Sequence, residues 1–75
     1  MRKSYWRLMA SRRRKERYAT LKEVAEAAKN YLRDNPAKQN VFILKSEYGH
    51  GPLRGRTYFK PIDGYFPYLD TKWSR

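Results

Sequence analysis

Apolar side chains recur with helical spacing between Leu21 and Leu32, which predicts an amphipathic helix. Thr20, three residues before Glu23, gives the pattern of a capping box, in which each side chain satisfies a free backbone N–H. Pro36 cannot continue a helix and disfavours helical backbone at the residue before it. The helix is therefore expected from Leu21 to about Asp34. Its apolar face is formed by Leu21, Val24, Ala25, Ala28, Tyr31 and Leu32.

Alternating apolar and polar positions predict the strands of a sheet. In residues 4–11, Trp6, Leu8 and Ala10 fall on one face, with Tyr5, Arg7 and Met9 on the other. Residues 40–46 contain the run V-F-I-L, apolar on both faces, as expected for a central strand. Residues 56–60 form a third candidate. A short fourth strand at 17–19 would pair with 4–11 across a turn at 12–15.

The remaining segments contain turn residues and lack a clear period. Glycine and proline in residues 48–55 predict a wide hairpin loop. The aromatic tail, residues 61–75, is expected to be irregular and to pack on the sheet through Phe66, Leu69 and Trp73. We assign Trp6 and Phe42 to the core. The chain is thus predicted to be one α+β domain over residues 1–75, an antiparallel sheet of three or four strands with one helix on one face.

Composition supports a folded domain and offers no catalytic centre. The chain has 75 residues, of which 40% are hydrophobic, including twelve aromatic residues, whereas disordered chains are poor in aromatics. It has no cysteine, so disulfides and thiolate metal sites are excluded. His50 is the only histidine and the seven acidic residues are scattered. We therefore expect no enzyme, no cofactor and no metal.

Hydropathy and charge indicate the compartment and the class of partner. No apolar run approaches the roughly 20 residues of a membrane span, so we expect a cytoplasmic protein without a membrane partner. Eighteen basic against seven acidic residues give a net charge of +11. Eight of those basic residues lie in residues 1–18, with a single acidic residue among them. The helix is nearly neutral, which argues against a basic recognition helix in a major groove.

The basic loop at 12–17 (R-R-R-K-E-R) is the main candidate site. Such a run is often a solvated loop or a localisation signal. Arginine forks also match phosphate oxygens, and their binding releases counterions from a nucleic acid. We predict DNA or RNA binding through phosphates, with Arg54 and Arg56 projecting from the same sheet edge as the basic loop. The predicted contacts are Arg7, Arg12, Arg13, Arg14, Lys15, Arg17, Arg54 and Arg56.

Aromatic residues lie between these charges along the chain. Sheets that bind single strands stack bases on exposed rings flanked by cations. Tyr5 and Tyr58 are the predicted stacking residues, and Tyr48 is a further candidate. The alternative is that these rings belong to the core, because so small a domain needs most of its aromatics there.

Three segments in order resemble small accessory proteins of tailed bacteriophages. They are Y-W-R-L-M-A-S, then R-Y-A-T-L-K-E-V-A-E-A-A, then N-P-x-K-x-N-V-F-I-L-K, and the resemblance covers about residues 4–46. It implies a phage-encoded protein that binds and redirects a machine of the host bacterium. It carries no functional motif, so no site residue is transferred.

The second hypothesis is a non-enzymatic inhibitor or adaptor that docks on an acidic surface of a host protein. A charge of +11 would steer that association as it would binding to nucleic acid. An exposed apolar patch in the tail would favour a protein partner. A buried tail would favour nucleic acid. Edge strands in so small a sheet leave a dimer open as well.

Overall fold

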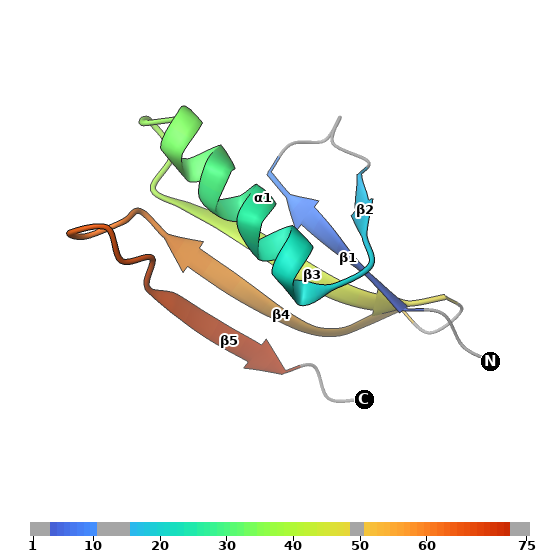
Figure 1. Cartoon of the computed structure of the whole chain (residues 1–75). Helices are drawn as coiled ribbons and strands as arrows, with labels where there is room; N and C mark the ends of the chain where they lie inside the picture. The colour runs from blue at the N-terminus through green and yellow to red at the C-terminus, as the bar shows by residue number, and fades with distance from the viewer. Residues whose placement is uncertain (1–3, 11–15, 49–50, 73–75) are drawn as a thin grey trace.

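One helix lies across one face of a five-stranded antiparallel sheet in a computed structural model that describes residues 4–10, 16–48 and 51–72 (Figure 1). The strand order is β2-β1-β3-β4-β5, with the long β3 in the middle and β2 and β5 at the edges. The elements are β1 (Ser4–Met9), β2 (Arg17–Tyr18), α1 (Leu21–Asp34), β3 (Asn40–Glu47), β4 (Gly51–Phe59) and β5 (Tyr68–Lys72). The predicted α+β class is confirmed, with five strands where three or four were expected.

Helix α1 has the predicted bounds and the predicted cap. The Oγ1 atom of Thr20 accepts a hydrogen bond from the Glu23 amide at 3.2 Å. The Glu23 carboxylate in turn accepts one from the amide of Ala19, one residue before the cap, also at 3.2 Å. At the other end the Asn35 amide donates to the Tyr31 carbonyl at 3.0 Å, and Pro36 follows.

The core lies between α1 and the sheet. The central strand β3 contributes Ile43, which is fully buried and faces Leu8 across the β1–β3 pairing. The short residues of the helix, above all Ala28, allow α1 to lie close to this strand. The buried apolar side chains are Trp6, Leu8, Val24, Ala28, Leu32, Val41, Ile43 and Tyr58.

Strand β4 begins earlier than expected, at Gly51, so most of the predicted wide loop at 48–55 is strand. A shift in register allows this, because Lys45 pairs with Arg54 but Ser46 pairs with Pro52, which leaves Leu53 as a bulge. A bulge tolerates proline, since one residue there makes no regular ladder hydrogen bond. Glycine and proline therefore mark an irregular strand here, and the prediction of a wide loop is wrong.

The tail also differs from its predicted irregular course, because residues Tyr68–Lys72 form the edge strand β5. The chain reverses before β5 through a two-residue turn between Ile62 and Tyr65, whose backbones exchange hydrogen bonds of 2.8 and 2.9 Å. Asp63 and Gly64 have φ of 51° and 79°, both in the left-handed region that a type I′ turn requires. An Asp-Gly pair is the usual sequence for that turn.

Two side chains, Phe42 and Leu69, lie elsewhere than predicted. Phe42 is only half-buried and lies on the face of the sheet away from α1, although Trp6 is in the core as expected. Leu69 is 62% exposed instead of packing back on the sheet, whereas Phe66 does pack in part against the core. Trp73 lies outside the described residues.

Strand alternation and register together assign side chains to the two faces of the sheet. We call the side away from α1 the open face, because α1 packs against the other side and no described element covers this one (Figure 1). The open face carries Tyr5, Arg7, Met9, Arg17, Phe42, Leu44, Tyr48, Thr57, Phe59, Leu69 and Thr71.

No helix of the described residues is long and apolar enough to cross a membrane.

Candidate nucleic-acid interface

Two tyrosines and an arginine form a compact cluster at one end of the open face. The ring centroids of Tyr5 and Tyr48 are 4.7 Å apart with an interplanar angle of 49°. The Arg17 guanidinium donates a 2.7 Å hydrogen bond to the Tyr48 hydroxyl. Its central carbon lies 4.8 Å from the Tyr5 ring centroid and 5.4 Å from that of Tyr48. We call these three residues the Tyr5–Arg17–Tyr48 cluster.

The short strand β2 positions this arginine. Its two residues, Arg17 and Tyr18, point to opposite sides, and Tyr18 pairs with Trp6 on the helix side. Arg17 is consequently on the open face, directly opposite Arg7 of β1. Two cations facing each other across a strand pair repel. In the described residues neither makes an ion pair, so both charges remain available to an anion.

Apolar side chains continue the open face beyond the cluster. Met9 is 46% exposed, Phe59 37% and Leu69 62%, while Phe42 and Leu44 are half-buried between them. The face therefore combines rings, aliphatic groups and two arginines, without an acidic side chain among the residues assigned to it. The open face thus presents aromatic rings and positive charges together.

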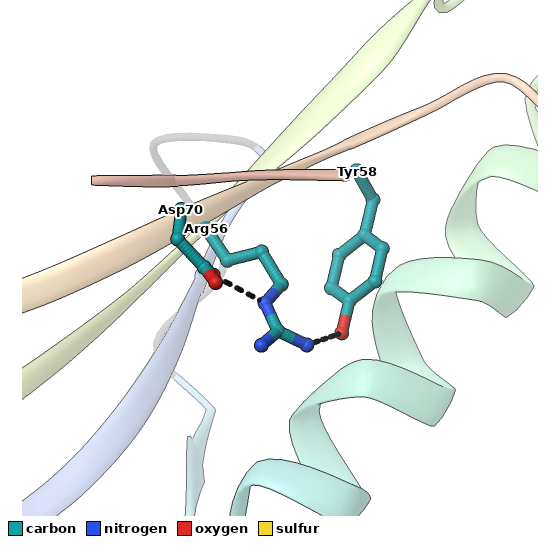
Figure 2. Close-up of polar contacts among 3 residues, drawn as sticks. All are labelled: Arg56, Tyr58 and Asp70. Atoms are coloured by element: carbon teal, nitrogen blue, oxygen red, sulfur yellow. Dashed lines mark hydrogen bonds and ion pairs between the residues drawn. The ribbon is translucent and has the colours of Figure 1, made fainter. Parts of the chain in front are cut away.

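Arg56, one of the predicted contacts, is instead held by the protein itself. Its Nε donates to Oδ1 of Asp70 at 2.6 Å and its terminal nitrogen donates to the Tyr58 hydroxyl at 3.2 Å (Figure 2). The guanidinium also lies 3.9 Å from the centroid of the Tyr68 ring. Burial lowers the pKa of Arg56, but the hydrogen bonds to Asp70 and Tyr58 outweigh it and the net shift is upward.

The predicted basic groups that the structure describes lie on two different sides of the sheet. Arg7 and Arg17 lie on the open face, whereas Arg54 and Arg56 lie on the helix side, where Arg54 is 5.7 Å from the Trp6 ring centroid. Successive side chains along a strand point to opposite faces of the sheet. Arg54 and Arg56 therefore lie on the same face as each other, opposite to the face that carries Arg7 and Arg17. Arg17 of the basic loop is thus on the other side of the sheet from Arg54 and Arg56, whereas the placement of residues 12–15 relative to them stays a prediction.

Tyr58 is wrong as a stacking residue, because it is only 3% exposed and forms part of the core. Tyr5 and Tyr48 do lie on the open face, half-buried and 48% exposed respectively. Arg12, Arg13, Arg14 and Lys15 lie outside the described residues, so their phosphate contacts stay a prediction.

Sequence reasoning missed a second group of cations, formed by Lys45 and Lys72 with Arg54. They are adjacent only because β3, β4 and β5 pair in one particular register, which includes the bulge at Leu53. No local signal in the sequence gives that register.

The described residues contain no group of three or more His, Cys, Asp or Glu side chains that could hold a metal ion. The open face presents planar rings and fixed positive charges, so it can serve as a binding surface. Comparison of the chain with protein-family models, curated proteins and solved structures finds no match.

Proposed function

We propose that this protein binds nucleic acid, with the open face of its sheet as a docking surface. The observation that carries the proposal is the Tyr5–Arg17–Tyr48 cluster, on a face that no described element covers, in a chain of net charge +11. Rings supply a stacking surface for bases, and arginines supply phosphate contacts and long-range attraction.

The shape of the face favours an unpaired strand over a duplex. Five strands spaced about 4.8 Å apart are wider than a B-DNA major groove of about 12 Å. The open face as a whole therefore cannot enter the groove, but a single strand can lie across it. The tyrosine rings of the open face can then contact unpaired bases, whereas the bases of a duplex are stacked inside its helix.

Residues 12–15 of the basic loop would add phosphate contacts to those of Arg7 and Arg17. About five neutralised phosphates give a log–log salt slope of about −3.5 on a single strand and about −4.5 on duplex DNA. Most of the affinity is then electrostatic, and the cluster adds the preference for unpaired bases.

The test measures fluorescence anisotropy of labelled single-stranded DNA, single-stranded RNA and duplex DNA from about 50 to 300 mM salt. The open-face variant is Arg7→Ala/Arg17→Ala, and the loop variant changes Arg12, Arg13 and Arg14 to Ala. The charge-matched control is Arg33→Ala/Lys38→Ala, which removes two exposed cations away from the open face.

We expect both the open-face and loop variants to weaken binding and flatten the salt slope, by about one unit for each phosphate that is no longer neutralised. The control should change affinity much less. Equal losses of affinity in the open-face variant and the control would mean that only the net charge of the protein matters. That result would reject the open face as the docking surface. Absence of binding near physiological salt would reject nucleic-acid binding altogether.

A second candidate is a protein partner, and the exposed tail favours it. Ile62, Tyr65 and Leu69 are each more than 60% exposed and Tyr68 is 48% exposed. These side chains do not form a single patch, since Tyr68 and Leu69 are consecutive in β5 and point to opposite faces. The tail therefore supports a protein partner less strongly than one continuous apolar surface would.

The two candidates separate in a pull-down from nuclease-treated bacterial lysate with the variant Ile62→Ser/Tyr65→Ser. A single acidic protein that the native chain captures and this variant does not supports docking on a protein. Unchanged nucleic-acid affinity in the same variant shows that the turn at Ile62–Tyr65 is not part of the open-face site.

A further inference from the structure

We infer that the helix side of the sheet holds a second, separate site for a phosphate group, formed by Lys45, Arg54 and Lys72. The site is independent of the open face, because the sheet itself lies between the two. Its ligand class is a phosphate, either free or as part of a nucleic-acid backbone.

The three cations form a row across adjacent strands. Lys45 of β3 pairs with Arg54 of β4, and Arg54 pairs with Lys72 of β5. Directly opposite residues have Cβ atoms about 4.5–5.5 Å apart, and like charges at that spacing destabilise a sheet. A bound anion would relieve this repulsion, because each cation would then have an opposite charge beside it.

One carboxylate beside this row, that of Asp70, is already occupied. Asp70 precedes Lys72 by two residues on the same side of β5, but its Oδ1 accepts the 2.6 Å hydrogen bond from Arg56. Across the described residues, Lys45, Arg54 and Lys72 make no ion pair. Glu47 lies two residues from Lys45 on the same side of β3, but within the described residues no ion pair offsets the charge of the row.

A small pocket lies beside two of the three cations, Arg54 and Lys72. It has a volume of about 100 Å³ and is lined by Arg54, Lys72, Trp6 and Leu21 together with Gly55, Arg56, Asp70 and Thr71. Lys45 Nζ lies 5.8 Å, and the Arg54 guanidinium 5.7 Å, from the Trp6 ring centroid, so both cations lie beside this ring. Leu21 is the first residue of α1, whose positive dipole end adds to the same field.

These features fit a phosphate better than a carboxylate. A phosphate oxygen cluster can accept from several cations at once, and arginine pairs with two of its oxygens in one plane. The pocket volume is about that of three water molecules, which suits one small tetrahedral group rather than a whole base.

The experiment follows the indole N–H of Trp6 by NMR in a ¹⁵N-labelled Trp73→Phe background, so that a single indole is observed. Inorganic phosphate is titrated first, and then a short single strand and a short duplex. The site variant is Arg54→Ala/Lys72→Ala, and the matched control is again Arg33→Ala/Lys38→Ala.

We expect saturable shifts of the Trp6 indole whose affinity falls by at least about tenfold in the site variant, since removing each charge-assisted hydrogen bond costs about that much. The control should bind as the native chain does. Inorganic phosphate binding by itself identifies a free phosphate as sufficient ligand. Shifts given only by the oligonucleotides identify a phosphodiester backbone, and both results support the site.

Shifts of equal affinity in the site variant, or the absence of any saturable shift, overturn the inference. The open-face variant Arg7→Ala/Arg17→Ala should leave unchanged the phosphate affinity that the Trp6 shifts measure. Failure of the helix-side site and failure of the open-face proposal therefore give different results in these variants.

Discussion

Arg56 of β4 and Asp70 of β5 face each other in register and are joined by a 2.6 Å hydrogen bond between Nε and Oδ1 (Figure 2). The Arg56 side chain is 21% exposed and that of Asp70 57%, so water screens the pair in part. The contact links the edge strand β5 to β4. It also pairs the charge of Arg56 with that of Asp70, so this arginine adds less to the positive potential of the surface.

Replacing Asp70 with Asn should lower the free energy of unfolding only slightly, by about 0.2–1 kcal/mol, as is usual for exposed pairs. It should also strengthen phosphate binding on the helix side, because a negative charge beside Lys72 and Arg54 is removed. Urea unfolding and the Trp6 titration measure the two effects. Weaker phosphate binding in this variant would contradict the helix-side site.

Arg56 itself should give stability little pH dependence. Its pKa is raised in the folded state, so its contribution is present below the ordinary arginine pKa and lost only as pH rises through the higher folded value. Urea unfolding of the native chain and of Arg56→Gln should therefore differ by a constant free energy between about pH 6 and pH 9. A difference that changes across this range would mean that another group titrates with the pair.

Ile43 should be far more sensitive to truncation than Leu69. Ile43 is fully buried between β3 and α1, so Ile43→Val should lower the free energy of unfolding by about 0.5–1.5 kcal/mol. Leu69 is 62% exposed, and Leu69→Ala should change it by less than about 0.5 kcal/mol. Urea midpoints compare the two directly. A large loss of stability at Leu69 would show that the open face is covered, for example by a second copy of the chain.

The capping box should contribute as a coupled pair. Thr20→Ala should cost about 1 kcal/mol of unfolding free energy, because the Glu23 amide loses its acceptor. Glu23→Ala removes the return hydrogen bond to Ala19. The double variant should cost less than the two single changes added together, as a double-mutant cycle measures. Full additivity would mean that the two hydrogen bonds act independently.

Tyr48 should report on base stacking. Tyr48→Ala is expected to weaken single-strand binding by about 1–3 kcal/mol, whereas Tyr48→Phe keeps the ring and should lose much less. Tyr65→Ala is the control, since Tyr65 is 64% exposed but lies at the turn before β5. Equal affinities for Tyr48→Ala and Tyr65→Ala would remove stacking from the open-face proposal.

The candidate site was predictable only in part. Tyr5, Tyr48, Arg7 and Arg17 could be singled out because rings and cations follow one another along the chain. Their meeting on one face depends on β2 pairing with β1 so that Arg17 faces Arg7. Tyr58 has the same local signal as Tyr48, yet it is buried, since its side of β4 is the side that α1 covers.

Local patterns alone determined the helix and the class of fold. The cap at Thr20, the 3.6-residue period and the stop at Pro36 act within a few residues, so the bounds Leu21–Asp34 follow from sequence. The β-branched and aromatic run in residues 41–44 likewise has one consistent outcome, a central strand. Net charge is a sum over the chain and needs no structure.

Tertiary structure alone decided the bulge at Leu53, the edge strand β5 and the face on which each cation lies. These depend on hydrogen-bond register between strands, and a shift by one residue would turn every side chain of a strand to the opposite face. Lys45, Arg54 and Lys72 are far apart in sequence and become neighbours only through that register. The number of charges was therefore set by the sequence, and their division between two faces by the pairing of the strands.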